Sequence, residues 1–261
     1  MDLGLKGKVA LVAAASKGLG HGVAKALAGE GARVSMCSRS ALEIQEAATR
    51  LAQESGAETL GIACDMSSAD SISAWVDQTV TRWGVIDAVL VNAGGPPSGF
   101  FKDFSDAQWQ AAFELTLMSS VRLIRTVIPH MVNGGSILTI TASSVVEPIE
   151  GLILSTVMRS GVVGLVKVLS DELASSNIRV NNLLPGRIET DRVAHLDQSM
   201  AERLNMSVEQ VRARSIARIP LGRLGSADEF GMAAAFLLSP AAAYITGATL
   251  RFDGGLIRAI T

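Results

Sequence analysis

The chain has 261 residues and a mass of 27.2 kDa, and a chain of this length buries roughly 75% of its unfolded surface. An apolar fraction of 48% and a mean hydropathy of +0.34 exclude a disordered chain. The 23 basic and 25 acidic residues nearly balance and form no basic run, which argues against a nucleic-acid or anionic-membrane partner. Cys37 and Cys64 lie in apolar segments without metal-ligand spacing, so we expect no disulfide scaffold, no metal site and a reducing, cytoplasmic location.

The first segment, Met1–Lys8, is too short and too polar for a signal peptide.

Seven short runs rich in β-branched residues predict strands. The predicted strands are Val9–Ala13, Arg33–Cys37, Thr59–Ala63, Ala88–Asn92, Ser136–Thr141, Arg179–Leu184 and Thr249–Phe252. These runs are continuously apolar rather than alternating, which is typical of a parallel sheet covered on both faces.

Segments with helical periodicity separate the predicted strands. Apolar residues recur at helical spacing in Ile72–Val80, and Ser40-x-x-Glu43 and Ser226-x-x-Glu229 predict capping boxes at two helix starts. Strands that alternate with helices predict an α/β fold, a single-domain doubly wound Rossmann fold with a seven-stranded parallel sheet and helices on both faces. No repeat or linker divides the chain, so we expect one domain over residues 1–261.

One uncharged stretch, Met232–Leu250, is long enough to cross a bilayer. Ser239-Pro240 and Thr246-Gly247 interrupt it, which favours a buried helix followed by a turn and a strand. We therefore expect a soluble protein.

A glycine loop follows the first predicted strand. Ligands of such sheets bind beyond the carboxyl ends of the strands, where the strand order reverses. The loop there reads Ala14-Ala15-Ser16-Lys17-Gly18-Leu19-Gly20. Its glycines allow close approach to a pyrophosphate, and the following helix start offers free N–H groups. Taken alone the signal is weak, because a structural turn would explain it equally well.

Further motifs follow in order along the chain. Asp65 comes after the third strand, Asn92-Ala93-Gly94 after the fourth, Pro185-Gly186 after the sixth, and Ile245-Thr246-Gly247-Ala248 before the last. With the glycine loop, these motifs make about residues 5 to 257 similar to the short-chain dehydrogenase/reductase superfamily, in the branch of 3-oxoacyl-acyl-carrier-protein reductases. The resemblance implies a dinucleotide whose adenine lies at Asp65 and whose nicotinamide lies at Pro185-Gly186.

The resemblance also implies a full set of cofactor contacts. These are Ala14, Ser16, Lys17, Gly18, Leu19, Gly20, Ser38, Arg39, Asp65, Met66, Asn92, Ala93, Gly94, Arg159, Pro185 and Gly186. The family's loop usually begins Thr-Gly, whereas Ala14 stands at the first glycine here. Its methyl group is tolerated if Ala14 keeps φ below zero.

The end of the second strand indicates which dinucleotide binds. NAD-selective sites place an acid there for the ribose 2′-hydroxyl, and NADP-selective sites place a base for the 2′-phosphate. This strand ends in Cys37-Ser38-Arg39-Ser40 with no acid, and Lys17 lies in the glycine loop. Two such bases around one phosphate predict NADP(H) rather than NAD(H), although both could be ordinary surface residues.

The family's chemistry is hydride transfer to or from a carbonyl. There a tyrosine acts as general acid/base, a lysine four residues later lowers its pKa, a serine polarises the carbonyl and an asparagine supports a water relay. The motifs Gly161–Leu165 and Leu169–Leu173 set the register, which places Ser155 at the tyrosine and Arg159 at the lysine.

Two more positions complete the comparison. Counting back from Pro129 puts Thr116 at the asparagine, and the serine survives as Ser143 or Ser144. A serine hydroxyl is a far weaker acid than a phenol, and arginine does not give up its proton. The family's usual mechanism therefore does not transfer to this sequence.

Substitutes for the missing acid are few. The single tyrosine, Tyr244, is expected near the last strand and outside the cleft. Glu147 and Glu150 could donate a proton if burial raised their pKa, but loop glutamates are more often solvated. His195 lies in the expected substrate lid, about residues 186–218, where one histidine is more often incidental. The six arginines of that segment face five acids, so their number supports no conclusion about an anionic substrate.

Three functions remain open. The first is an NADP(H)-dependent oxidoreductase acting on a small carbonyl or alcohol substrate with a rearranged site. The second is a dinucleotide-binding protein with little or no turnover, a sensor or partner subunit, and the third has abandoned the cofactor. By resemblance we also expect a homo-oligomer, as a tetramer, because the apolar helix Leu165–Leu173 and the uncharged segment Met232–Leu250 would otherwise expose apolar surface.

Overall fold

The computed structural model describes residues 2–260 and places seven strands in one parallel sheet. The strand order is β3-β2-β1-β4-β5-β6-β7, with every neighbouring pair parallel. The strands are β1 (Val9–Val12), β2 (Arg33–Ser38), β3 (Thr59–Ala63), β4 (Ala88–Val91), β5 (Gly135–Ile140), β6 (Ile178–Pro185) and β7 (Thr249–Phe252). This order confirms the doubly wound Rossmann fold, and each strand begins and ends within one residue of its predicted bounds.

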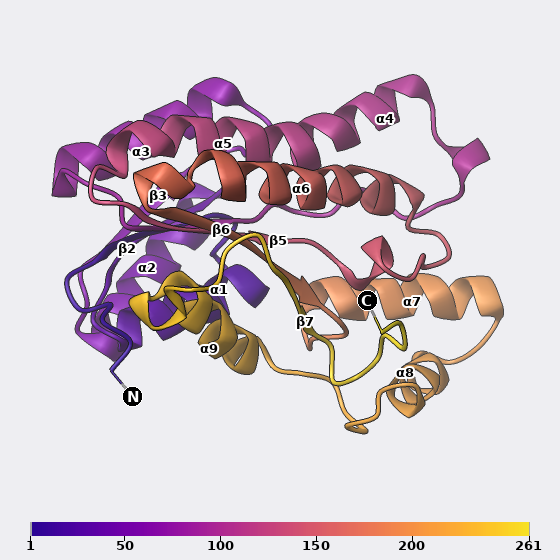
Figure 1. The fold of residues 1–261 in the computed structure, drawn as a ribbon. Coiled ribbons are helices and arrows are strands. Elements are labelled where there is room, and N and C mark those ends of the chain that lie inside the picture. The colour runs from indigo at the N-terminus through magenta and orange to yellow at the C-terminus, as the bar shows by residue number, and fades with distance from the viewer. Residues whose placement is uncertain (1, 261) are drawn as a thin grey trace.

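Helices cover both faces of the sheet (Figure 1). They are α1 (Gly18–Gly29), α2 (Ala41–Ser55), α3 (Ala69–Trp83), α4 (Asp106–Ala112), α5 (Ser119–Val127), α6 (Ile153–Glu172), α7 (Asp191–Leu204), α8 (Val208–Ala217) and α9 (Ala227–Leu238). Between α4 and α5 lies a π-helical turn, η2 (Phe113–Met118). Short 3₁₀ turns are η1 (Phe101–Asp103), η3 (Ile128–His130), η4 (Ser143–Val145), η5 (Ala174–Ser176) and η6 (Pro240–Ala242).

Each face of the sheet has its own apolar core. Under α1, α2 and α9 the core includes the fully buried Leu27, Ile44 and Phe230. Under α3, α5 and α6 it includes the fully buried Trp75 and Leu123. Burying side chains of this size stabilises a fold by roughly 1.5–3 kcal/mol each, so the two cores hold the strand ends in fixed positions.

One of the two predicted capping boxes forms, and the other does not. Ser226 and Glu229 form the predicted reciprocal capping box at α9. At α2, Ser40 Oγ accepts from the backbone N–H of Glu43 at 3.3 Å, but the Glu43 carboxylate accepts no return bond from the Ser40 backbone N–H. The prediction of a second capping box is wrong because the Glu43 side chain lines the cleft instead.

The uncharged stretch Met232–Leu250 folds as predicted, into the end of α9, the turn η6 and the start of β7. A different helix, α6, is the one described helix long and apolar enough by composition to cross a membrane. Its residues Val162 and Val166 are buried, and the helix packs against β6. That packing explains its apolar composition as that of a core helix.

The helices α7 and α8 lie outside the two layers, beside the carboxyl ends of the strands (Figure 1). An ion pair between Arg187, which follows β6, and the buried Asp197 of α7 anchors this unit. A backbone bond from the Gly225 N–H to the Arg187 carbonyl ties its other end to the start of α9. The unit occupies the segment expected to form a lid, and it forms one wall of the cleft described next.

Candidate active site

A single large cleft of about 1730 Å³ runs along the carboxyl ends of the strands. Parallel strands bring the loops that follow them to one edge of the sheet, and β1 and β4 flank the point where the strand order reverses. Every predicted cofactor contact lines this cleft, as do Ser143, Ser155 and Arg159. Thr116 and Ser144 do not line it.

The start of α1 points free backbone donors into the cleft. Lys17 is the N-cap residue, with extended backbone (φ −158°), and makes no side-chain capping bond. Gly18 follows with φ +63°, and Gly18, Leu19 and Gly20 all line the cleft. An uncapped helix start of this kind attracts an anion such as a pyrophosphate. This local geometry fits a dinucleotide.

Ala14 takes a conformation that the sequence did not lead us to expect. Its φ is +52°, in the left-handed region, so the condition under which its methyl group would be tolerated without strain, a negative φ, is not met. The Ala14 carbonyl also lies close to α1: a Cβ on Gly20 would lie 2.3 Å from its oxygen, so only glycine fits at position 20. Ala14 keeps the backbone of the glycine it replaces, at a cost of about 1–2 kcal/mol.

The end of β2 lines the cleft with polar and basic groups. Ser38 Oγ donates to the Ser40 carbonyl at 3.1 Å, while Arg39 is exposed and pairs with no carboxylate among the described residues. After the neighbouring strand β3, the Ser67 backbone N–H and hydroxyl donate to Asp65 Oδ1 at 2.9 and 2.8 Å. These two bonds, backbone first, lower the pKa of Asp65, so Asp65 is ionised and fixed in orientation.

An ion pair bridges the glycine loop and α7. Lys17 Nζ lies 3.2 Å from Asp191 Oδ2, with both side chains mostly exposed. Asp191 is in the first turn of α7 and Thr190 caps that helix, accepting from the Val193 N–H at 3.4 Å. The base predicted at the 2′-phosphate therefore contacts a carboxylate of the lid unit.

The middle of the cleft is formed by β4 and β6. Asn92 Nδ2 donates to the Ala13 carbonyl at 3.4 Å, which joins the loops after β1 and β4. Gly186 donates its N–H to the Phe252 carbonyl at 2.9 Å, and a Cβ there would lie 2.7 Å from Asp253 Cα. Gly186 is therefore required for close packing of the β6 and β7 ends, whatever else it contacts.

Ser155 and Arg159 lie one turn apart on α6 and both line the cleft. Arg159 Nε donates to Ser155 Oγ at 3.2 Å, and a terminal nitrogen donates to the Ile140 carbonyl at 2.7 Å. Burial, with a smaller effect of the charge on Arg192, lowers the pKa of Arg159 to about 10. The guanidinium remains charged at neutral pH and keeps donors free for a ligand.

The two candidate serines have different surroundings. Ser143 is 7% exposed and lines the cleft, whereas Ser144 is fully buried and its hydroxyl has no partner within the described residues. Of the two, only Ser143 is placed to touch a ligand in the cleft. Thr116 lies in η2, buried, with its hydroxyl equally without a partner in the described chain. Its carbonyl accepts from Ser120 Oγ at 3.0 Å.

The predicted substitutes for the tyrosine are mostly engaged elsewhere. Glu147 lines the cleft but accepts from the Arg258 N–H at 2.9 Å. Glu150, also in the cleft, lies 3.8 Å from Arg203. His195 is exposed on α7 and does not line the cleft, and Tyr244 is fully exposed and outside it.

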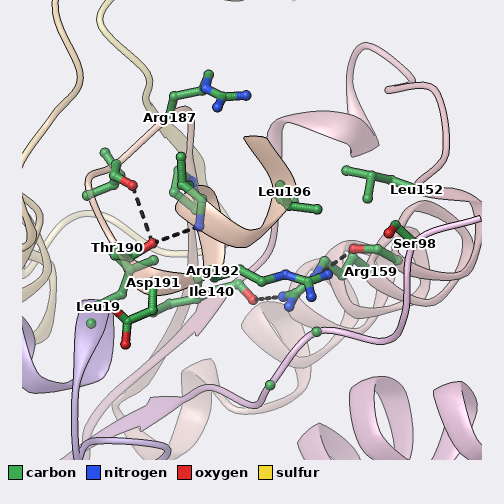
Figure 2. Close-up of a pocket in the computed structure, with 18 of the residues that line it drawn as sticks. Leu19, Ser98, Ile140, Leu152, Arg159, Arg187, Thr190, Asp191, Arg192 and Leu196 are labelled. Carbon is green, nitrogen blue, oxygen red and sulfur yellow. Dashed lines mark hydrogen bonds between the residues drawn. The ribbon is translucent and has the colours of Figure 1, made fainter. Parts of the chain in front are cut away.

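Arg192 is a cleft residue that sequence reasoning missed. It reaches from the first turn of α7 into the same region as Arg159 (Figure 2) and donates to the Pro96 carbonyl at 2.9 Å. Partial burial lowers its pKa. In the sequence, Arg192 is one of six arginines in a segment whose charges nearly balance, so no local pattern distinguishes it from the other five.

Known proteins resemble this chain over nearly its whole length. A family model described as enoyl-(acyl carrier protein) reductase matches residues 13–257. A 3-oxoacyl-[acyl-carrier-protein] reductase of Chlamydia muridarum is 33% identical, over 97% of this chain and 98% of its own. An L-sorbose reductase of Gluconobacter frateurii, solved with NADPH and L-sorbose, is 28% identical with a TM-score of 0.94 and full coverage of both chains. An actinorhodin polyketide ketoreductase with NADPH is 31% identical with a TM-score of 0.92, over 97% and 98% of the two chains.

Proposed function

Because the chain belongs to the short-chain dehydrogenase/reductase family, we propose that it is an NADP(H)-dependent oxidoreductase with a rearranged active site. Its substrate is a small carbonyl compound or the corresponding alcohol, in a reaction like that of 3-oxoacyl-acyl-carrier-protein reductases. One observation carries the proposal: a continuous cleft joins the uncapped start of α1 to Ser143, Ser155 and Arg159.

Different residues along the cleft would contact different parts of the cofactor. The free N–H groups of Gly18 and Leu19 hold the pyrophosphate, and Asp65 accepts from the adenine. Arg39 and Lys17 favour NADP(H), because a 2′-phosphate gains two charge-assisted bonds there. The relatives solved with NADPH agree with this assignment. The bound nicotinamide supplies or accepts the hydride.

The protein's own contribution to the reaction is polarisation of the carbonyl. Ser143 and Ser155 donate hydroxyl hydrogen bonds, and Arg159 adds a positive charge beside Ser155. Donors fixed where negative charge develops stabilise the transition state. No described cleft residue offers a phenol, and loss of a positioned general acid costs roughly 10²–10⁴ in rate. We therefore place its turnover well below that of family members with the tyrosine.

The second candidate is a dinucleotide-binding protein with little or no turnover, acting as a sensor or partner subunit. It is favoured by the Arg159–Ser155 hydrogen bond, which fills the position of the acid with a pair that gives up no proton readily. The same cofactor contacts serve both candidates, so cofactor binding does not separate them. Turnover does.

We also assign the protein to a homo-oligomer, as a tetramer, in the cytoplasm. Apolar side chains remain exposed on α6 and near the C-terminus, among them Val157, Val168, Met232 and Leu250. The free thiols Cys37 and Cys64 fit a reducing compartment.

The test measures binding first and turnover second. NADPH and NADH are titrated into the purified protein, and a panel of carbonyl and alcohol substrates is then followed at the nicotinamide absorbance. Tight NADPH binding with measurable carbonyl reduction supports the oxidoreductase. NADPH binding without turnover on any substrate supports the second candidate, and no binding of either dinucleotide overturns both.

A further inference from the structure

Two arginines share the substrate end of the cleft without a carboxylate partner. Arg159 comes from α6 and Arg192 from α7, and each lines the cleft. Within residues 2–260, no ion pair joins either of them to an acid. We propose that these two guanidinium groups bind a carboxylate, and that the substrate is therefore an oxo acid or hydroxy acid. The oxo or hydroxy part rests on the proposed function, whereas the carboxylate part rests on the two arginines.

The donors of Arg159 are only partly used. Of its five N–H groups, one is given to Ser155 Oγ and one to the Ile140 carbonyl. These two bonds fix the plane of the guanidinium and leave the remaining edge free. A planar edge held in this way suits a carboxylate, which accepts two parallel N–H bonds.

Arg192 is held in the same way from the opposite wall. One terminal nitrogen donates to the Pro96 carbonyl at 2.9 Å, so the group is fixed by a neutral acceptor and keeps its full charge. The charge of Arg192 is close enough to lower the pKa of Arg159. Two like charges this close repel one another even though Arg192 is exposed, and a bound anion reduces that repulsion.

Every acid that lines the cleft, except Glu43 in the first turn of α2, contacts another group. Asp191 pairs with Lys17, and Glu150 pairs with Arg203. Glu147 accepts from the Arg258 N–H, and Asp103 accepts from the Phe100 N–H at 2.8 Å. These contacts hold the carboxylates away from the two guanidinium groups, so the anion must come from a ligand.

Apolar side chains surround the two arginines and indicate the rest of the ligand. Leu152 and Leu196 lie beside them in the close-up (Figure 2), and Ile149, Met200 and Leu204 also line the cleft. A cleft that is apolar apart from a few placed charges orients an amphipathic ligand. We infer a linear or branched aliphatic chain attached to the acid.

Binding of hexanoate, measured without cofactor, tests the site separately from turnover. Hexanoate and hexanamide have the same shape and differ in charge, so calorimetric titration of both isolates the effect of the carboxylate. We expect hexanoate to bind at least about tenfold more tightly, since a hydrogen bond to a charged group contributes that much or more. Arg192→Gln should remove most of this preference, and Arg159→Met should remove the rest.

A matched control separates local pairing from general charge. Arg214→Gln removes one positive charge from α8, outside the cleft lining and from a side chain that pairs with no carboxylate of the described chain, and should leave hexanoate binding unchanged. Thermal melts of each variant show whether it is folded, and inability of Arg159→Met to fold would leave Arg192→Gln as the deciding variant.

Any of five results would overturn the proposal. Equal binding of hexanoate and hexanamide, or no binding at millimolar hexanoate, removes the carboxylate site. An unchanged preference in Arg192→Gln removes the pair. If NADPH displaces hexanoate competitively, or inorganic phosphate binds as well as hexanoate, the anion belongs to the cofactor and not to the substrate.

Discussion

Arg159 Nε donates a hydrogen bond to Ser155 Oγ at 3.2 Å, across one turn of α6. The guanidinium uses the serine oxygen as an acceptor, so the serine proton is free to point into the cleft. A positive charge at this distance favours the alkoxide slightly, but it brings a serine nowhere near the acidity of a phenol. The pair can polarise a carbonyl better than it can protonate one.

The first prediction restores the acid. In the double variant Ser155→Tyr with Arg159→Lys, kcat/KM for a 3-oxoacyl substrate at saturating NADPH should rise, by up to roughly 10²–10⁴. The rise should be incomplete, because Thr116 still stands at the asparagine position. Steady-state kinetics of the parent and the double variant provide the comparison.

Single variants control this experiment. Ser155→Ala and Arg159→Ala should each lower whatever reductase rate the parent has. A parent with ordinary family rates that neither change affects would show that the register of α6, or the assignment of the site to these residues, is wrong.

The second prediction concerns the choice of dinucleotide. Arg39 is exposed at the end of β2 and lines the cleft. Arg39→Asp should weaken NADPH and strengthen NADH, because an acid repels the 2′-phosphate and accepts from a free 2′-hydroxyl. Fluorescence titration of both cofactors measures the ratio of affinities. Equal affinities in the parent, or an unchanged ratio in Arg39→Asp, would contradict the NADP(H) assignment.

The third prediction concerns stability. Ala14 has φ +52°, so Ala14→Gly should raise the free energy of unfolding by roughly 0.5–1 kcal/mol, since glycine avoids the left-handed penalty but gains freedom in the unfolded chain. Ala15 is fully buried and has no positive φ, so Ala15→Gly should lower it. Urea unfolding of both variants gives the two signs, and a destabilised Ala14→Gly variant would mean that Ala14 carries no backbone strain.

The fourth prediction concerns pH. Burial and then the charge of Arg192 lower the pKa of Arg159 to about 10. The lowered value means that the free protein loses this charge as pH rises through about 10, while a carboxylate ligand stays ionised. Hexanoate affinity should therefore be level from about pH 7 to about pH 9 and fall above that range. Binding itself favours the charged form, which moves the fall to higher pH.

Hexanamide serves as the neutral reference for this titration. Its affinity should not change over the same range, because it does not depend on the guanidinium charge. A parallel loss for both ligands would indicate unfolding rather than deprotonation.

The fifth prediction concerns assembly. The exposed Val157 and Val168 of α6, and Met232 and Leu250 near the C-terminus, should be covered in an oligomer, because apolar area of this kind is removed from water on association. Sedimentation at micromolar concentration should show a species several times the 27.2 kDa chain mass. A single species at the chain mass would refute it.

Sequence patterns predicted the parts of the molecule that depend on local chemistry. Continuous apolar runs located the strands to within one residue, and Ser226 with Glu229 formed the expected cap. The residues of the glycine loop and those that follow β2, β3 and β4 gathered along one cleft, because parallel strands end at a common edge.

The parts that depend on tertiary contacts were not predictable in this way. The left-handed φ of Ala14 and the close approach of its carbonyl to Gly20 are set by how the loop packs on α1, and no residue type in the loop signals them. Glu43 does not complete its cap because its side chain turns to the cleft. Arg192 has no distinguishing neighbours in sequence, and only the docking of α7 brings it beside Arg159.

The ion pair between Lys17 and Asp191 joins the glycine loop to α7 by a contact whose strength depends on ionic strength. Both side chains are mostly exposed, and pairs of this kind contribute only about 0–1 kcal/mol and weaken as salt shortens the screening distance. A phosphate bound at Lys17 would compete with Asp191 for the ammonium group, at little cost in stability. An anion at the glycine loop and a high salt concentration would therefore act alike on α7, since each leaves the Asp191 carboxylate without its ammonium partner.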